Sequence, residues 1–276
     1  MNGVSAVVLG VIEGVTEFLP VSSTAHLTIA EALMGMKTDA PAVTAFTAVI
    51  QMGAILAAIV YFRRDIRTVV TAWFRGLVRA DERRSPDALL GWYVIAGTIP
   101  IGLAGYLGRN VIKHDLRSLW YVVAGLVLWS IAIVYAERTA AQRRDLRDMR
   151  LPDAVFIGVI QVLALVPGVS RSGATISAGL RQGFDRVAAT RFSFLLAIPA
   201  LLAAGIFELK DAVGTSGVSA ASLVVGTGVA FLTAYASIAW LLRFVAHHSL
   251  TNFVWYRVTV AVFVVAALTT GLVHAV

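Results

Sequence analysis

The 276-residue sequence contains no cysteine. This absence excludes disulfide bonds, thiolate nucleophiles and metal sites built from cysteine. Charged residues are also scarce, at 14%, whereas hydrophobic residues make up 58% of the chain and fall in long uncharged runs. A soluble core does not need so much apolar sequence, so the composition predicts an all-α polytopic, multi-pass membrane protein.

The N-terminus has no basic segment, and Glu13 and Glu17 interrupt its first apolar stretch. We therefore expect no cleaved signal peptide. The net charge of +7 comes mostly from arginine, which concentrates in two connections, residues 63–88 and 137–153. This pattern orients a membrane protein, and it argues against nucleic acid as a partner, which would require a basic face on a folded domain.

Two stretches of the chain follow the same plan. Residues 10–26 read GVIEGVTEFLPVSSTAH, and residues 158–175 read GVIQVLALVPGVSRSGAT. Each contains an apolar run too short to cross a bilayer, a proline and a cluster of small polar residues. Pro20 and Pro167 should each end a half-helix, and the serines that follow should cap a second one. Broken helices with polar tips are typical of a site built at membrane depth.

The rest of the chain predicts six full spans, near residues 43–62, 89–107, 119–136, 187–207, 222–245 and 253–273. The half-helices are expected over residues 3–19, 22–34, 154–166 and 170–183. Further pairs match in the same order, which indicates a duplication, among them Gly97-Thr98 with Gly226-Thr227 and Trp120-Tyr121 with Trp255-Tyr256. We expect one membrane domain over residues 1–276, made of a repeat over 1–136 and another over 154–276.

The two arginine-rich connections set the expected orientation. Both should be cytoplasmic, and two spans separate them. Each repeat then holds a re-entrant broken-helix pair plus three transmembrane helices. Because three is odd, the second repeat should be inverted relative to the first, with both termini outside and the re-entrant pairs meeting near the midplane. The Trp–Tyr pairs at 120–121 and 255–256 are expected in the aromatic belts of the membrane interface.

The first stretch supplies acids, hydroxyls and a histidine. Glu13 and Glu17 are four residues apart, so their carboxylates lie on one helix face. Two ionised carboxylates at membrane depth are costly, so one should hold a proton or both should face a cation. A solvent-facing acidic patch near a helix end is the structural alternative. His26 lies one turn beyond Ser22 and Ser23, within reach of either, although a lone histidine on a helix is usually structural.

The second stretch carries a single charge, Arg171, which lies between Ser170 and Ser172 and one turn before Thr175. An arginine with hydroxyls and free N–H groups at a helix N-terminus favours an anion, because a guanidinium forks onto phosphate oxygens. The alternative is that Arg171 only pairs with one of the two acids. The two interpretations are compatible with one another.

On the motifs EGVTEFLPVSSTAH and PGVSRSGAT, the chain resembles the bacterial undecaprenyl-diphosphate phosphatase family of the bacitracin-resistance type. The resemblance covers nearly the whole chain. It implies a hydrolase of the bacterial plasma membrane that acts on a phosphoric anhydride, the terminal phosphate of a C55 polyprenyl diphosphate. The active site would open to the outer face, and the reaction would recycle the carrier lipid for peptidoglycan synthesis.

The resemblance also assigns roles to residues of both stretches. The catalytic residues would be Glu13, Glu17, Ser23, His26 and Arg171, and the phosphate-binding residues would be Ser22, Ser170, Arg171, Ser172 and Thr175. Ala25 stands where the family often has glycine, a small departure. A divalent cation, Mg²⁺ or Ca²⁺, is implied as a cofactor, with Glu13 and Glu17 as its expected ligands, although these acids alone do not complete a cage.

Two alternatives stay open at this point. The nucleophile is either Ser23, activated by His26 or Glu17, or a water molecule with Glu17 or His26 as its base. In both routes Arg171 stabilises charge on the transferring phosphoryl group. Inverted repeats with broken helices are also typical of transporters, so a transporter or polyprenyl-phosphate flippase is the alternative function. The expected partners are the lipid substrate and membrane lipids, and a homodimer is left open.

Overall fold

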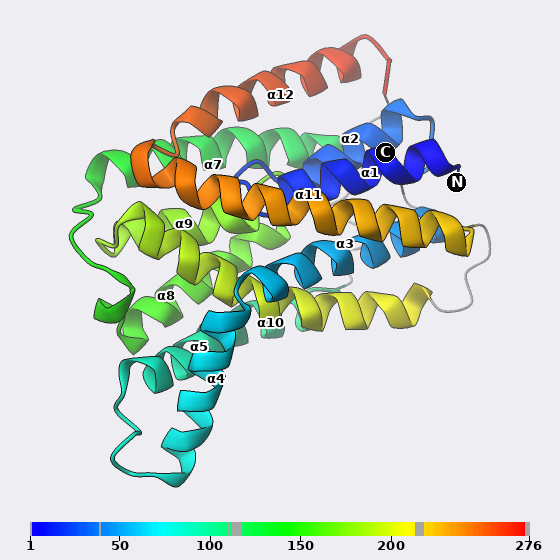
Figure 1. Cartoon of the computed structure of the whole chain (residues 1–276). Helices are drawn as coiled ribbons and strands as arrows, with labels where there is room; N and C mark the ends of the chain where they lie inside the picture. Colours follow the sequence, from blue (N-terminus) through cyan, green and yellow to red (C-terminus); the bar gives the residue numbers. More distant parts are fainter. Residues whose placement is uncertain (1, 39, 110, 112–117, 213–217, 274–276) are drawn as a thin grey trace.

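A computed structural model of the chain describes residues 2–38, 40–109, 111, 118–212 and 218–273. The regular elements in these ranges are helical, with one isolated bridge between Arg144 and Phe184 (Figure 1). In chain order they are α1 (Gly3–Thr16), α2 (Ser23–Leu33), α3 (Pro41–Tyr61), α4 (Arg63–Val78), α5 (Pro86–Leu107), α7 (Leu119–Thr139), η2 (Leu146–Asp148), α8 (Leu151–Gln161), η3 (Val162–Leu165), α9 (Arg171–Arg181), α10 (Arg186–Ala212), α11 (Ala220–His247) and α12 (Asn252–Thr269).

Six helices in the described part of the chain are long and apolar enough to cross a membrane, namely α3, α5, α7, α10, α11 and α12. They correspond to the six spans that the sequence predicts, with similar bounds. The prediction of an all-α polytopic membrane protein is therefore confirmed. The polar loop between the second and third spans lies mostly outside the described residues.

The half-helices form two pairs, α1 with α2 and α8 with α9. The longest of them, α1, has 14 residues, and at about 1.5 Å per residue it is too short for a hydrocarbon core of about 30 Å. The expected end of the first half-helix is wrong, because α1 ends at Thr16, whereas the second half-helix continues through η3 to Leu165, close to the expected residue 166. Pro20 disfavours helix at the residue before it, and the chain leaves α1 one turn earlier. The turn η3 tightens the chain between α8 and Pro167.

Residues 63–78 form a helix, α4, where the sequence analysis expects an arginine-rich loop. The arginines prevent this segment from resembling a span, but its apolar residues recur on one face. Ile66 and Val69 pack against the main hydrophobic cluster. Trp73 lies so close to α5 that a Cβ on Gly91 would be 3.0 Å from its side chain. The amphipathic pattern therefore outweighs the charge in deciding the local structure.

Glycines allow the first half-helix of each pair to pack with its backbone in contact with the backbone of a full span. A Cβ on Gly10 of α1 would lie 2.6 Å from the carbonyl oxygen of Gly226 in α11, and one on Gly158 of α8 would lie 2.3 Å from that of Gly97 in α5. Real Cβ atoms do not approach oxygen so closely, so both contacts require glycine. These are the residues that the sequence analysis pairs as repeats, Gly10 with Gly158 and Gly97 with Gly226.

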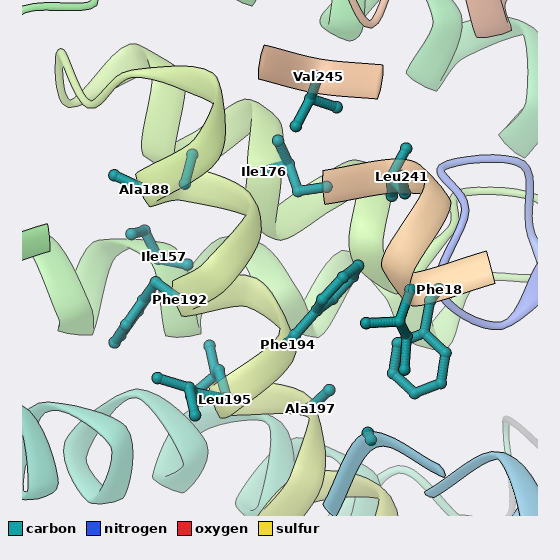
Figure 2. Close-up of a cluster of buried hydrophobic side chains, with 14 of the residues drawn as sticks. Phe18, Ile157, Ile176, Ala188, Phe192, Phe194, Leu195, Ala197, Leu241 and Val245 are labelled. Atoms are coloured by element: carbon teal, nitrogen blue, oxygen red, sulfur yellow. The ribbon is translucent and has the colours of Figure 1, made fainter. Parts of the chain in front are cut away.

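The largest cluster of buried hydrophobic side chains joins the turn after α1 to α10 and α11 (Figure 2). Phe18 of that turn packs edge-to-face on Phe194 of α10, with ring centroids 5.2 Å apart and an interplanar angle of 81°. Both side chains are fully buried. Because Phe18 follows Glu17 directly, this packing fixes the turn that carries a candidate catalytic acid.

Candidate active site

The turns that follow α1 and α8 contact one another directly. The hydroxyl of Ser172, at the start of α9, donates to the carbonyl oxygen of Leu19 at 2.8 Å. The hydroxyl of Ser170 lies 3.5 Å from the same oxygen. The two stretches that the sequence singles out thus bring their polar tips together within the fold.

Glu17 connects the two tips. Its Oε1 accepts a hydrogen bond from Nη2 of Arg171 at 3.1 Å, and its Oε2 accepts one from the hydroxyl of Ser23 at 2.5 Å. The side chains of Arg171 and Glu17 are only 9% and 5% exposed, so water screens the pair weakly. A single carboxylate therefore joins the hydroxyl of the first stretch to the guanidinium of the second.

Arg171 has further donors that Glu17 does not use. Its Nε and Nη1 are buried and have no hydrogen-bond partner within the part of the chain that the structure describes. The guanidinium lies 5.7 Å from the ring centroid of Phe18, a cation–π distance. A buried donor without a partner is costly, by about 1–3 kcal/mol and more when it is charged. These N–H groups are therefore suited to an anionic acceptor such as a phosphate.

Ser22 and Ser170 are the N-caps of α2 and α9. The Ser22 hydroxyl accepts from the N–H of Ala25 at 3.4 Å, and the Ser170 hydroxyl accepts from the N–H of Gly173 at 3.2 Å. Both serines have positive φ angles, 77° and 74°. Residues other than glycine rarely adopt positive φ angles. Such a backbone conformation persists where the surrounding structure imposes it, and it is common at active sites.

The remaining hydroxyls of the second tip are engaged inside the protein. Ser172 and Thr175 are fully buried. The Thr175 hydroxyl donates to the carbonyl of Arg171 at 2.9 Å and lies 2.6 Å from the hydroxyl of Ser193. By contrast, Ser23 is only half-buried. The expected phosphate-binding roles of Ser22, Ser170, Ser172 and Thr175 stay predictions, and these hydroxyls stabilise the tips in the geometry seen here.

His26 directs both ring nitrogens away from Ser23. Its Nδ1 lies 2.7 Å from the carbonyl oxygen of Ser22, which can only accept, so Nδ1 carries the hydrogen. Its Nε2 lies 2.8 Å from the hydroxyl of Tyr256, and in this neutral tautomer it accepts a hydrogen bond from that hydroxyl. The two rings are stacked, with centroids 5.5 Å apart and planes 4° from parallel. The partner of the Ser23 hydroxyl is therefore Glu17 rather than His26.

Tyr256 is a site residue that the sequence analysis misses. The expectation that it belongs only to an aromatic belt is incomplete, because its half-exposed ring is held against His26. The two residues are 230 positions apart, and no local pattern connects them. The available signal is the next residue, Arg257, because a charge inside an otherwise apolar span usually marks function.

Glu13 lies one turn before Glu17 on α1 and is 1% exposed. Both acids therefore lie at the buried end of the half-helix, on the face that the four-residue spacing predicts. Within the described residues, no group of three or more His, Asp or Glu side chains is placed to hold a metal ion. The expectation that Glu13 and Glu17 hold a divalent cation stays a prediction.

Comparisons with known proteins identify the family of this chain. The family described as "Bacitracin resistance protein BacA" matches residues 6–263. A protein named undecaprenyl-diphosphatase from Acidothermus cellulolyticus is 99% identical over 276 residues, with both chains covered completely. Proteins named undecaprenyl-diphosphatase 1 from Frankia alni and Streptomyces coelicolor are each 54% identical, covering 98% of this chain and 97% of their own. The chain therefore belongs to the bacitracin resistance protein BacA family.

Proposed function

We propose that this protein is an undecaprenyl-diphosphatase, a membrane hydrolase that removes the terminal phosphate from a C55 polyprenyl diphosphate. Its relatives at 54% and 99% identity carry that name. The observation that carries the chemistry is the bridge through Glu17, which holds a hydroxyl on one oxygen and a guanidinium with unused donors on the other. In this proposal the three side chains of that cluster act as nucleophile, base and phosphate-binding cation.

In the first step the Ser23 hydroxyl attacks the terminal phosphorus of the diphosphate. Its proton passes to Oε2 of Glu17, the atom to which it is already hydrogen-bonded. The bond between phosphorus and the bridging oxygen breaks, and polyprenyl monophosphate leaves. The free N–H groups of Arg171 stabilise the charge on the transferring phosphoryl oxygens, where preorganised donors have their largest effect.

In the second step water attacks the phosphoserine and releases inorganic phosphate. Glu17, now protonated, returns its proton to the Ser23 oxygen as that oxygen leaves. His26 lies one helical turn beyond Ser23 and is the proposed base for the attacking water. Its Nε2 takes a proton from that water once it gives up the hydrogen bond that it now accepts from the hydroxyl of Tyr256. The competing route, direct attack by water on the diphosphate, would use the same base and Arg171 without a phosphoserine.

A divalent cation is part of this proposal. Mg²⁺ is commonly held by one or two carboxylates together with substrate phosphates, and Glu13, in the last turn of α1, lies four residues before Glu17, the buried residue that caps the end of the helix. These two residues would hold the ion. When bound, it would neutralise charge on the diphosphate and polarise a phosphoryl oxygen.

The proposal also includes the orientation expected from the sequence. The outer face would carry the active site and both termini, and the arginine-rich connections would be cytoplasmic. The equivalent glycine contacts, Gly10 with Gly226 and Gly158 with Gly97, support two repeats built on one plan. An inverted arrangement of those repeats would let the two re-entrant pairs enter from opposite faces.

Phosphate release from polyprenyl diphosphate by the purified protein in detergent tests this function. Detergent leaves no second compartment, so turnover there cannot come from transport. We expect release by the wild type and a loss of about 10²-fold or more in Glu17→Gln, because the amide cannot accept the proton. Glu82→Gln, which alters an acid paired with Arg79 beyond α4, is the matched control and should be unaffected. A wild type that releases no phosphate would refute the proposal.

A further inference from the structure

Arg257 of α12 is the largest fully buried side chain in the described part of the chain, with 0% exposure. Among the described residues no carboxylate forms an ion pair with it, and its donors meet neutral oxygens instead. An isolated buried cation is expensive unless its hydrogen bonds are satisfied. Hydrophobic packing alone therefore does not explain why an arginine is buried at this position.

The oxygens around Arg257 come from three separate segments. Nη1 donates to the carbonyl of Pro20, in the first turn, at 2.9 Å. Nη2 donates to the carbonyl of Gly168, in the second turn, also at 2.9 Å. Nε donates to the hydroxyl of Ser130 in α7 at 3.1 Å, and longer contacts reach the carbonyls of Gly125, Leu126 and Val169.

The shape of the side chain matches this task. A guanidinium is planar and offers five N–H donors in fixed directions, whereas an ammonium offers three from one atom. Carbonyls in turns lack the partners that helices provide, and a buried one must be satisfied by another donor. Arg257 satisfies a carbonyl of each turn with a different nitrogen, so the plane of its guanidinium fixes how the turns lie relative to one another.

We propose that Arg257 is a positioning residue for phosphoryl transfer, which holds the two turns in register behind the active site. This inference rests on the proposed phosphatase function. Pro20 lies three residues after Glu17 and three before Ser23, and Gly168 lies three residues before Arg171. A shift of either turn would therefore separate the base and nucleophile on one side from the phosphate-binding cation on the other.

The size of the effect follows from the geometry of the reaction. A displacement of about 1 Å at the reacting groups can cost about 10²-fold in rate. Because Arg257 lies behind the tips and contacts backbone carbonyls, its loss should lower kcat by about this factor and change KM little. Arg257→Lys keeps the charge but cannot reach both turns and α7 from one atom, so it should be about as slow as Arg257→Ala.

The experiment measures kcat, KM and melting temperature in detergent for the wild type, Arg257→Lys, Arg257→Ala and Arg243→Lys. Arg243 is an exposed arginine of α11 and is the matched control, expected to behave as wild type. Guanidinium ions at low concentration should restore part of the kcat of Arg257→Ala in a saturable way. Ammonium at the same ionic strength should not, because it cannot reproduce the planar set of donors.

Each outcome decides for or against the positioning role. An Arg257→Lys variant with the kcat of the wild type would overturn it, as would a folded Arg257→Ala variant that guanidinium does not rescue. If neither substitution yields folded protein, Ser130→Ala removes the Nε acceptor, together with the hydrogen bond that the hydroxyl donates to Leu126 within α7, and it should lower kcat several-fold at unchanged KM. Wild-type kcat in that variant would count against the proposal. A wild type without turnover would instead refute the phosphatase function itself.

Discussion

Replacement of Arg171 by lysine separates the two roles that its guanidinium can have. Lysine keeps a positive charge near Glu17 and can preserve the ion pair now formed by Nη2 at 3.1 Å. It removes Nε and Nη1, the buried donors that no described residue uses. The substitution therefore tests whether Arg171 neutralises Glu17 or binds the diphosphate.

The two roles predict different magnitudes. Loss of one preorganised donor to the charge that develops in the transition state costs about 2.7–4 kcal/mol, or about 10²- to 10³-fold in kcat. If Arg171 binds phosphate, Arg171→Lys should fall by about this factor and be nearly as slow as Arg171→Ala. If Arg171 only neutralises Glu17, lysine should suffice. Alanine would then act by leaving a buried acid unpaired, which costs about 3–5 kcal/mol of folding stability.

The assay is the initial rate of inorganic phosphate release in detergent, with melting temperatures recorded for each variant. Arg181→Lys is the matched control, because Arg181 lies on the last turn of the same helix, is exposed and donates to the hydroxyl of Thr139 at 3.1 Å. We expect wild-type turnover in this control. Near-wild-type kcat in Arg171→Lys, together with a low melting temperature in Arg171→Ala, would refute phosphate binding by Arg171.

Four other outcomes follow from the same contacts. Ser23→Ala should lose at least about 10²-fold in turnover, and radiolabelled substrate should trap a phosphoserine in the wild type. If Ser23→Ala loses less than about 10²-fold and no phosphoserine is trapped, water is the nucleophile. Tyr256→Phe should lower kcat about five-fold, because it removes one hydrogen bond to His26 of about 1 kcal/mol. An unchanged kcat would mean that ring stacking alone is enough to position His26. Gly158→Ala should lower the free energy of unfolding by about 1–3 kcal/mol, because its Cβ would meet the Gly97 oxygen at 2.3 Å, whereas Gly228→Ala has open space and should not. A cysteine at position 80 should resist an impermeant thiol reagent in intact cells, and its labelling there would contradict the proposed orientation.

The helices could be predicted well because their signals are local. Long apolar runs define the six spans, and a proline followed by serines marks each re-entrant tip. The half-helix ends were less predictable, since α1 stops at Thr16 where Phe18 turns into the core. Helix α4 was not predicted because residues 63–78 are rich in arginine, and its apolar face is recognisable only from the neighbour against which it packs.

The candidate site could be predicted only in part. Glu17 and Arg171 stand out because charged side chains are scarce in this chain, and Ser23 stands out because it belongs to the polar cluster after Pro20; the structure brings the three together. The partner of Ser23 could not be chosen from spacing, because His26 at one turn's distance lies over the Ser22 carbonyl instead. Tyr256 and Arg257 belong to the last span, and only tertiary packing brings them to the tips.

The backbone of the two capping serines bears on how this protein could be engineered for heat resistance. At φ angles of 77° and 74° a residue with a Cβ is strained by about 1–3 kcal/mol, whereas glycine is at ease. Glycine is also a nearly adequate N-cap, only a few tenths of a kcal/mol poorer than serine. Among the described residues the Ser22 hydroxyl makes only its capping hydrogen bond, whereas that of Ser170 also contacts Ser172. Selection for thermal stability alone would therefore favour glycine at Ser22. The resulting protein would be more stable but would lack a hydroxyl for which we expect a phosphate-binding role, so stability and turnover would be opposed at this position.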